Sequence, residues 1–392
     1  INSQGLIENV ASGQSRLEYP LIDGVVNGCP SVLLEPSRTN LVTYSEDFSN
    51  AYWTKSNATV ASNEIISPDG SLSADKLVED TSTNQHWIYK LSIPVTIGND
   101  YSISCFFKKG ERNYAQLRLL TNINLNAVFN LDTGEIHSNA SGVANIETFA
   151  DGWYRCSVSG TATSTGSAEF YHNINPTGIS GENYIGDGTS GIYIYGTQLE
   201  AGSYPTSYIK SNSGSATTRL ADTANGAGDA TTFNDSEGVL MAEISALSDD
   251  SSFKLFGINS GATGNDIVIL GYANVSNTLY VNTKIGSTSV ISSTAISIDQ
   301  KSFNKILVKY KSGSNSIYVN GFKLDSNTNT FTPTGNQLSE LEFSYYTNTL
   351  QFYGKTKQIQ YFQTALTDSE LEQLTSWISF TDMANGQLYT IE

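Results

Sequence analysis

Aromatic side chains at alternate positions of two short segments are the residues best suited to bind a ligand. Trp87 and Tyr89 are two residues apart in the first segment, and Tyr114, Gln116 and Arg118 alternate in the second. Residues two apart point to the same face of a β-strand, where rings can stack on the apolar faces of sugars. The spacing therefore predicts a glycan-binding face. The alternative interpretation is that Trp87 and Tyr89 fill the core of the domain.

A third segment extends this face if its strand register is right. Tyr171 and Asn173 share one side of a strand when Phe170 and His172 point inward. A slip of one residue would reverse both assignments, because the side-chain period of a strand is two. We predict that Tyr171 belongs to the glycan-binding set.

The motifs that would support catalysis are incomplete. Retaining glycosidases hold two carboxyl groups about 5 Å apart, and the nearest candidate here, Glu340 and Glu342, lacks a third acid. No Gly-x-Ser-x-Gly motif precedes a helical segment, so a serine nucleophile is not predicted either. We expect a binding protein rather than an enzyme and assign no catalytic residue.

Residues that often bind metals are scattered along the chain. His86, His137 and His172 have no H-x-H or H-x-x-E spacing, so we predict no transition-metal site. The three cysteines are an odd number without C-x-x-C spacing, which favours neither a disulfide framework nor a zinc site. We predict unpaired, buried thiols at these positions, which are Cys29, Cys105 and Cys156.

Composition and charge limit the fold class and the partners. Only 15% of the 392 residues are charged and 33 are glycine, which favours short strands joined by polar turns. The formal net charge of -17 repels phosphate backbones, so we expect neither nucleic acid nor an anionic membrane as a partner. Neutral sugars are compatible with this charge. The chain begins at Ile1 without a methionine, which suggests a piece of a longer protein.

Alternating apolar positions recur throughout and predict an all-β fold of two antiparallel β-sandwich, or jelly-roll, domains in tandem. Asn320-Gly321 predicts a hairpin with a type I′ turn. Thr367, followed three residues later by Glu370, predicts the capped start of one short helix. The predicted organisation is an extended segment at 1–40, a jelly roll at 41–210, a linker at 211–235, a second sandwich at 236–380 and a tail at 381–392.

Several segments resemble known families. The N-terminal run, which includes Gly5-Leu6-Ile7-Glu8 and Cys29-Pro30-Ser31-Val32-Leu33-Leu34-Glu35-Pro36, resembles a block of bacteriophage tail-fibre and head-fibre proteins. Asp151-Gly152-Trp153-Tyr154-Arg155 resembles jelly-roll carbohydrate-binding modules. The segments Phe303–Tyr310 and Ile317–Leu324 resemble laminin-G and concanavalin A-like lectin domains.

These resemblances imply roles for particular residues. Trp53 and Trp153 match positions that pack in the core of the family. Many such jelly rolls hold a structural calcium, for which Glu46 and Asp47 are the candidates. Gly196 stands where those modules often carry an acidic residue, and this departs from the calcium pattern. No other cofactor is implied.

The resulting hypothesis is a non-enzymatic phage virion protein that binds bacterial surface polysaccharide weakly and through several copies. It predicts other virion proteins as partners, a homo-oligomer such as a trimer, assembly in the host cytoplasm and an extracellular location after release. One alternative is a structural decoration or spacer protein of a phage head or tail without glycan binding. A second alternative is a carbohydrate-binding appendage of a secreted polysaccharide-degrading enzyme.

Overall fold

The computed structural model describes residues 1–392 except 12, 262–263, 336, 347–348 and 378–392. The predicted tail at 381–392 therefore lies outside the described residues. The chain divides into two compact units. Unit 1 gathers Ile1–Gln14, Glu18–Cys29 and Ser37–Ala221, and unit 2 gathers Ser15–Leu17, Pro30–Pro36 and the chain from Asp222 onward.

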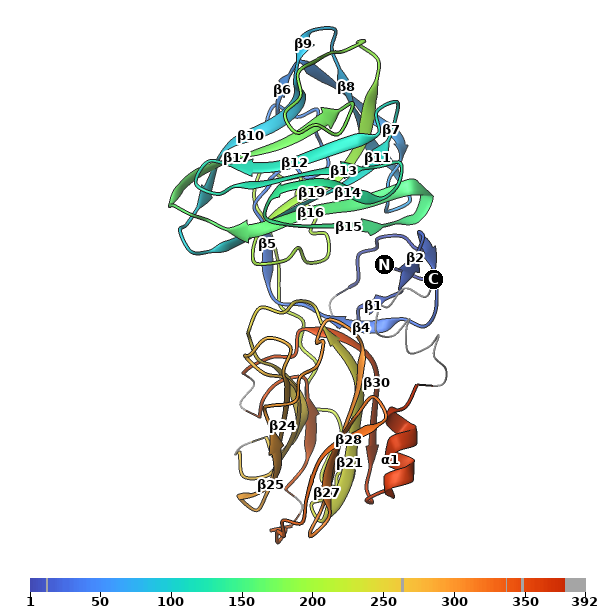
Figure 1. Ribbon diagram of the computed structural model, residues 1–392, viewed down its shortest axis with the longest axis vertical. Helices are drawn as coiled ribbons and strands as arrows, with labels where there is room; N and C mark the ends of the chain where they lie inside the picture. Colours follow the sequence, from blue (N-terminus) through green and yellow to red (C-terminus); the bar gives the residue numbers. More distant parts are fainter. Residues whose placement is uncertain (12, 262–263, 336, 347–348, 378–392) are drawn as a thin grey trace. The chain divides into compact units, whose positions relative to one another are not determined.

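Unit 1 contains two six-stranded antiparallel sheets (Figure 1). The first sheet has the spatial order β14 (Glu135–Ser141), β13 (Leu125–Asn130), β12 (Tyr114–Leu120), β17 (Gly166–Asn175), β10 (His86–Val95) and β6 (Thr54–Ser56). The second has the order β15 (Val143–Thr148), β16 (Trp153–Thr161), β11 (Asp100–Lys109), β19 (Gly191–Ala201), β8 (Leu72–Glu79) and β7 (Ala58–Ile66). Alternate residues of both sheets, such as Ile103 and Leu117, are fully buried in one shared core.

Short elements complete unit 1. Three two-stranded pairs are β2 (Leu21–Ile22) with β3 (Val25–Val26), β9 (Thr83–Asn84) with β18 (Tyr184–Ile185), and β5 (Arg38–Asn40) with β20 (Thr217–Arg219). A 3₁₀ turn, η1, spans Ala150–Gly152. The strand β20 lies inside the segment predicted to be a linker.

Unit 2 contains a seven-stranded and a five-stranded antiparallel sheet. The larger has the order β1 (Leu17–Glu18), β4 (Ser31–Leu34), β30 (Gly354–Phe362), β21 (Glu237–Ala246), β26 (Asn304–Lys311), β27 (Asn315–Val319) and β28 (Phe322–Asn327). The smaller has the order β25 (Thr288–Ser293), β24 (Leu279–Ile285), β23 (Ile267–Tyr272), β22 (Lys254–Asn259) and β29 (Glu340–Glu342). The helix α1 (Asp368–Thr375) packs Leu371 against β26 and β27 on the outer face of the larger sheet.

The prediction of an all-β fold with two antiparallel sandwiches is confirmed. The predicted hairpin pairs Val319 with Phe322, and both turn residues have the positive φ of a type I′ turn, 50° at Asn320 and 88° at Gly321. Thr367 and Glu370 form the predicted capping box of α1. The hairpin turn and the capping box were predictable because each depends on local sequence alone.

Two expectations need correction or refinement. Cys105 and Cys156 are buried and unpaired as predicted, but Cys29 is exposed, because it follows a bend at Gly28 and belongs to no sandwich strand. The segment predicted at 1–40 divides between the two units. Its residues Pro30–Pro36 belong to unit 2, where β4 pairs with β30.

One finding bears on the membrane. Among the described residues, no helix is long and apolar enough to cross a bilayer.

Candidate functional site

The predicted site residues lie on the outer face of the first sheet of unit 1. Their strand neighbours Ile88, Leu117 and Phe170 have no exposed surface and belong to the core. Because side chains alternate across a strand, the residues between them point away from the core. The structure therefore brings β10, β12 and β17 together with their predicted faces on the same side.

Four of these residues form a contiguous group, which we call the aromatic face: Trp87, Tyr89, Arg118 and Tyr171. Tyr171 is the direct cross-strand partner of Tyr89 on one side and of Arg118 on the other. Its ring stacks on Tyr89, with centroids 5.3 Å apart, and meets Trp87 edge-on at 5.6 Å. The Arg118 guanidinium carbon lies 5.5 Å from the Tyr171 ring centroid. Tyr171 is thus the centre of the group, and all four side chains are half-buried.

A second row of directly paired residues crosses the three strands and ends beneath the loop that contains Ser180. Trp87, Asn173 and Gln116 are direct partners across β10, β17 and β12. Gln116 has the predicted orientation but no exposed surface, which corrects the expectation that it faces solvent. Its Nε2 donates to Asn126 Oδ1 and to Ser180 Oγ, both at 2.7 Å. Gln116 therefore fastens the loop that contains Ser180 to the sheet and forms one boundary of the aromatic face.

Tyr114 lies on the same side of the sheet but apart from the aromatic face. Its ring packs edge-on against His137, with centroids 4.9 Å apart. Within the described residues it makes no ring contact with Trp87, Tyr89 or Tyr171. A ligand that covers the central rings would reach Tyr114 only if it extended along β12.

The aromatic face carries one half-buried cation, Arg118. In the part of the chain that the structure describes, the Arg118 guanidinium makes no hydrogen bond, and its Nε is buried. Burial lowers the pKa of Arg118, while the nearby Tyr171 and Glu169 oppose that change. The indole Nε1 of Trp87 is likewise buried without a partner. Polar hydrogens without partners are uncommon in folded proteins and indicate where a ligand or water binds.

Tyr171 keeps its proton over the whole physiological range. Burial and the hydrogen bond to Glu169 raise the pKa of Tyr171 to about 12. Its hydroxyl donates to Glu169 Oε2 at 2.7 Å. The alternation Glu169, Tyr171 in the sequence could have identified Glu169 as a neighbour of the site. No local pattern could have identified Ser180, because the loop reaches Gln116 only through the tertiary fold.

The predicted calcium ligands do not fit a shared ion. Glu46 Oε1 accepts hydrogen bonds from the hydroxyls of Tyr195 and Tyr208, and Glu46 Oε2 pairs with Lys210. Asp47 accepts hydrogen bonds from Ser49 and Asn50 instead. Calcium needs six to eight oxygen ligands, and the described residues contain no group of three or more His, Cys, Asp or Glu placed to hold a metal.

The carboxyl groups of Glu340 and Glu342 are neighbours on β29, in unit 2. Burial and contact with Glu342 raise the pKa of Glu340. The two residues share one face of the three-residue strand, and they stay the nearest approach in this chain to the paired carboxyl groups of a retaining hydrolase.

Both tryptophans expected in the core are buried. Trp53 and Trp153 are each 1% exposed. Trp53 belongs to the core between the sheets, and Trp153 packs on the outer side of the second sheet against Phe106 and Phe149.

Comparisons with known proteins give slight likenesses only. No family model matches the chain, and no curated protein matches it. A solved carbohydrate-binding module, "Ruminococcus gnavus IT-sialidase CBM40", matches with 17% identity and a TM-score of 0.32, covering 39% of this chain and 94% of that one. The NanB sialidase from Streptococcus pneumoniae matches with 18% identity and a TM-score of 0.31, covering 38% of this chain and 27% of the sialidase.

The mouse laminin alpha1 chain, domains LG4-5, matches with 12% identity and a TM-score of 0.26, covering 92% of this chain and 96% of that one. Likenesses at these identities and TM-scores carry no argument about function. The function is therefore inferred from the residues of the chain itself.

Proposed function

We propose that unit 1 binds glycans through the aromatic face. The observation that carries this proposal is the half-buried group of Trp87, Tyr89 and Tyr171 beside an arginine without hydrogen-bond partners. Half-exposed rings offer flat apolar surfaces to sugar rings, and Arg118 offers a planar set of donors to sugar oxygens. Aromatic residues and arginine are also the side chains that most often dominate binding energy at interfaces.

Binding at one such face is expected to be weak. The rings are half-buried side chains on one face of a sheet, so we expect a bound sugar to keep part of its hydration. A dissociation constant of about 1 mM corresponds to roughly 4 kcal/mol. Useful attachment would then require several copies of the chain on one particle.

The setting that we propose is a phage fibre that contacts bacterial surface polysaccharide. Its support is the resemblance of the N-terminal segments to tail-fibre and head-fibre proteins. In this setting the chain would assemble in the host cytoplasm as a homo-oligomer, join other virion proteins and act outside the cell after release. The role that we propose is adhesion without catalysis.

A binding screen tests adhesion against the structural alternative. The full chain, joined to a trimerising tag, would be applied to a glycan array and to whole bacterial cells. Saturable binding to a defined set of glycans is the expected result. Failure to bind every glycan and every bacterial strain would contradict adhesion and favour a decoration or spacer role.

A further inference from the structure

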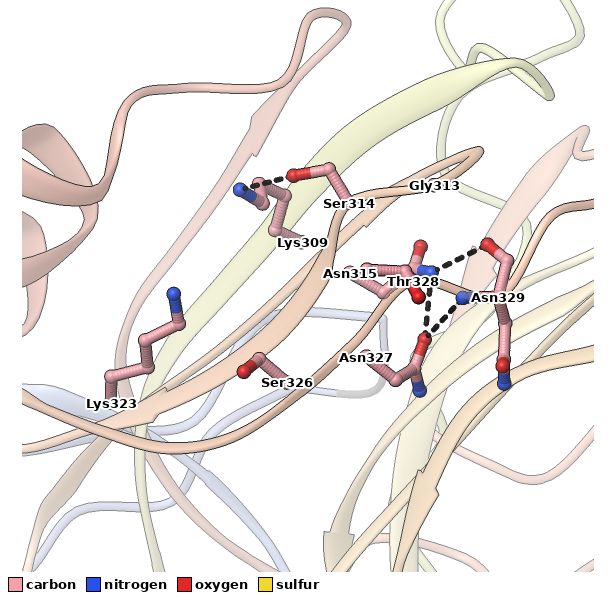
Figure 2. A pocket seen from close by; sticks show the side chains of 9 residues that line it. All are labelled: Lys309, Gly313, Ser314, Asn315, Lys323, Ser326, Asn327, Thr328 and Asn329. Carbon is pink, nitrogen blue, oxygen red and sulfur yellow. Dashed lines mark hydrogen bonds between the residues drawn. The ribbon is translucent and has the colours of Figure 1, made fainter.

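The second unit contains a hollow whose chemistry differs from that of the aromatic face. It has a volume of about 490 Å³ and lies at the end of the β27–β28 hairpin. Figure 2 shows the residues that line it, which are Lys309, Gly313, Ser314, Asn315, Lys323, Ser326, Asn327, Thr328 and Asn329. Two of the nine residues are lysines and none carries a carboxylate, in a chain whose net charge is -17. We call this site the lysine hollow.

Strand register explains why the lysines meet there. Lys309 on β26 is the direct partner of Ser316 on β27, which is in turn the partner of Ser326 on β28. Lys323 is the partner of Tyr318 in the same hairpin. In Figure 2, Lys309 and Lys323 project on one side of the hairpin. The three asparagines lie on the other side and bind one another: Asn315 Nδ2 donates to Asn327 Oδ1 and to the Asn329 carbonyl.

The Lys309 ammonium is buried and makes few polar contacts. Lys309 is only 6% exposed. Its Nζ donates one long hydrogen bond, 3.2 Å, to Ser314 Oγ, and lies 3.5 Å from Asp368 Oδ1. An ammonium has three donors, and a buried charge is costly unless it is paired and hydrogen-bonded. Lys309 therefore has unused donor capacity in a partly desolvated position.

One carboxylate pairs with both lysines. Asp368 Oδ2 also accepts a hydrogen bond from Lys323 Nζ at 2.9 Å. Asp368 is therefore shared between two ammonium groups, and neither lysine has this carboxylate to itself. Between Lys309 and Ser326, the hydroxyl of Ser316 is buried and has no partner in hydrogen-bond geometry among the described residues. An unpartnered hydroxyl beside two ammonium groups matches the donor set of an oxyanion site.

We propose that the lysine hollow binds one oxyanion group, a carboxylate, sulfate or phosphate, within the space lined by Lys309, Ser314 and Lys323, whose lining does not include Asp368. The group can come from a substituent on an acidic glycan or from a free inorganic anion. The overall negative charge disfavours long polyanions, so a single anionic group fits better than a continuous acidic chain. This site lies in unit 2 and does not depend on glycan binding by unit 1.

The test is a titration of the full chain followed by two-dimensional amide NMR spectra. Sodium phosphate, sodium sulfate, an oligosaccharide with a single uronic acid and its neutral counterpart would be added separately, with sodium chloride keeping the ionic strength constant. We expect saturable shifts of the amides around Lys309, Ser314, Lys323 and Ser326 with at least one oxyanion. Shifts caused by the inorganic ions alone identify a free anion as the ligand, and shifts caused by the acidic oligosaccharide identify a glycan substituent.

Three lysine variants make the test specific. Lys309→Met and Lys323→Met keep the apolar stem and remove the charge, and each should weaken binding at least tenfold. Lys311→Met is the matched control, because Lys311 lies on the same strand but pairs with Glu237 outside the hollow. It should change the affinity less than twofold. The side chain of Lys323 is 37% exposed, so we expect Lys323→Met to fold. This variant still tests the site if Lys309→Met unfolds.

Three results would overturn the proposal. One is the absence of saturable shifts with every oxyanion. Another is an equal response to the neutral oligosaccharide. The third is equal weakening by Lys311→Met, which would indicate a general charge effect.

Discussion

At the scale of single residues, Tyr171 is the centre of the proposed site. It touches Tyr89, Trp87 and Arg118 at once, so its loss would disturb every member of the aromatic face. Its hydroxyl is fixed by Glu169, which leaves the ring as the part that a sugar can use. The ring, rather than the phenol, should therefore determine affinity.

Two buried titratable residues of unit 1 have opposite effects on stability. Burial raises the pKa of Asp75 to about 6 from 3.8, so the folded chain retains a proton that the unfolded chain loses. Its contribution to stability falls as pH rises from about 4 to 6. Burial lowers the pKa of His172 to about 3 from 6.5, so the unfolded chain binds a proton that the folded chain does not. Its contribution to stability falls as pH decreases from about 6.5 towards 3.

These two effects should nearly cancel between pH 4 and 6, and substitution should separate them. Asp75→Asn removes the pH-dependent contribution of Asp75 and leaves that of His172. The free energy of unfolding of this variant should therefore rise with pH by about 1.4 kcal/mol per pH unit more than that of the wild type. His172→Gln should change the slope by a similar amount in the opposite direction. Urea unfolding followed by tryptophan fluorescence at several pH values measures both slopes. Parallel curves for all three proteins would show that neither group titrates as described.

At the scale of elements, local sequence predicted the strands better than the tertiary contacts that the strands make. The alternation in β12 correctly separated Leu117, which is in the core, from Arg118, which is not. The sequence could not show that Gln116 lies under the loop containing Ser180, because that contact joins residues 64 positions apart. The pairing of β4 with β30 joins residues more than three hundred positions apart and leaves no local signal either.

The capping box of α1 offers a direct test at this scale. Thr367 Oγ1 accepts a hydrogen bond from the Glu370 backbone N–H, and the Glu370 carboxylate accepts one from the Thr367 N–H at 2.8 Å. Thr367→Ala should lower the free energy of unfolding of unit 2 by about 1 kcal/mol. Urea unfolding monitored by the NMR signals of unit 2 measures this change.

The matched control for the cap is Thr364→Ala, which removes an exposed threonine that precedes the helix. A surface substitution of this kind should change the free energy of unfolding by less than about 0.5 kcal/mol. Equal effects of the two substitutions would contradict a specific role for the cap.

At the scale of the whole molecule, charge and weak binding shape the proposed role together. A net charge of -17 keeps the chain away from most polyanions, and a single shallow face gives little affinity. A particle that displays many copies turns weak contacts into stable attachment, because each bound copy holds the others at high effective concentration.

The effect of copy number can be measured on one surface. Linking three chains should raise the apparent affinity for a glycan-coated surface by about 100-fold over the single chain. Surface plasmon resonance at several glycan densities measures this gain. If the trimer and the single chain bind equally at high glycan density, multivalent attachment is excluded.

The most direct test of the central claim is the affinity of Tyr171→Ala for a glycan that the wild-type chain binds, measured by isothermal titration calorimetry. The matched control is Tyr193→Ala, which removes a half-buried tyrosine from β19 on the other sheet of unit 1. Truncation of an aromatic residue that dominates a binding interface costs more than about 1 kcal/mol, so Tyr171→Ala should weaken binding at least fivefold while Tyr193→Ala leaves it unchanged. Unchanged affinity in a folded Tyr171→Ala chain would contradict glycan binding by the aromatic face.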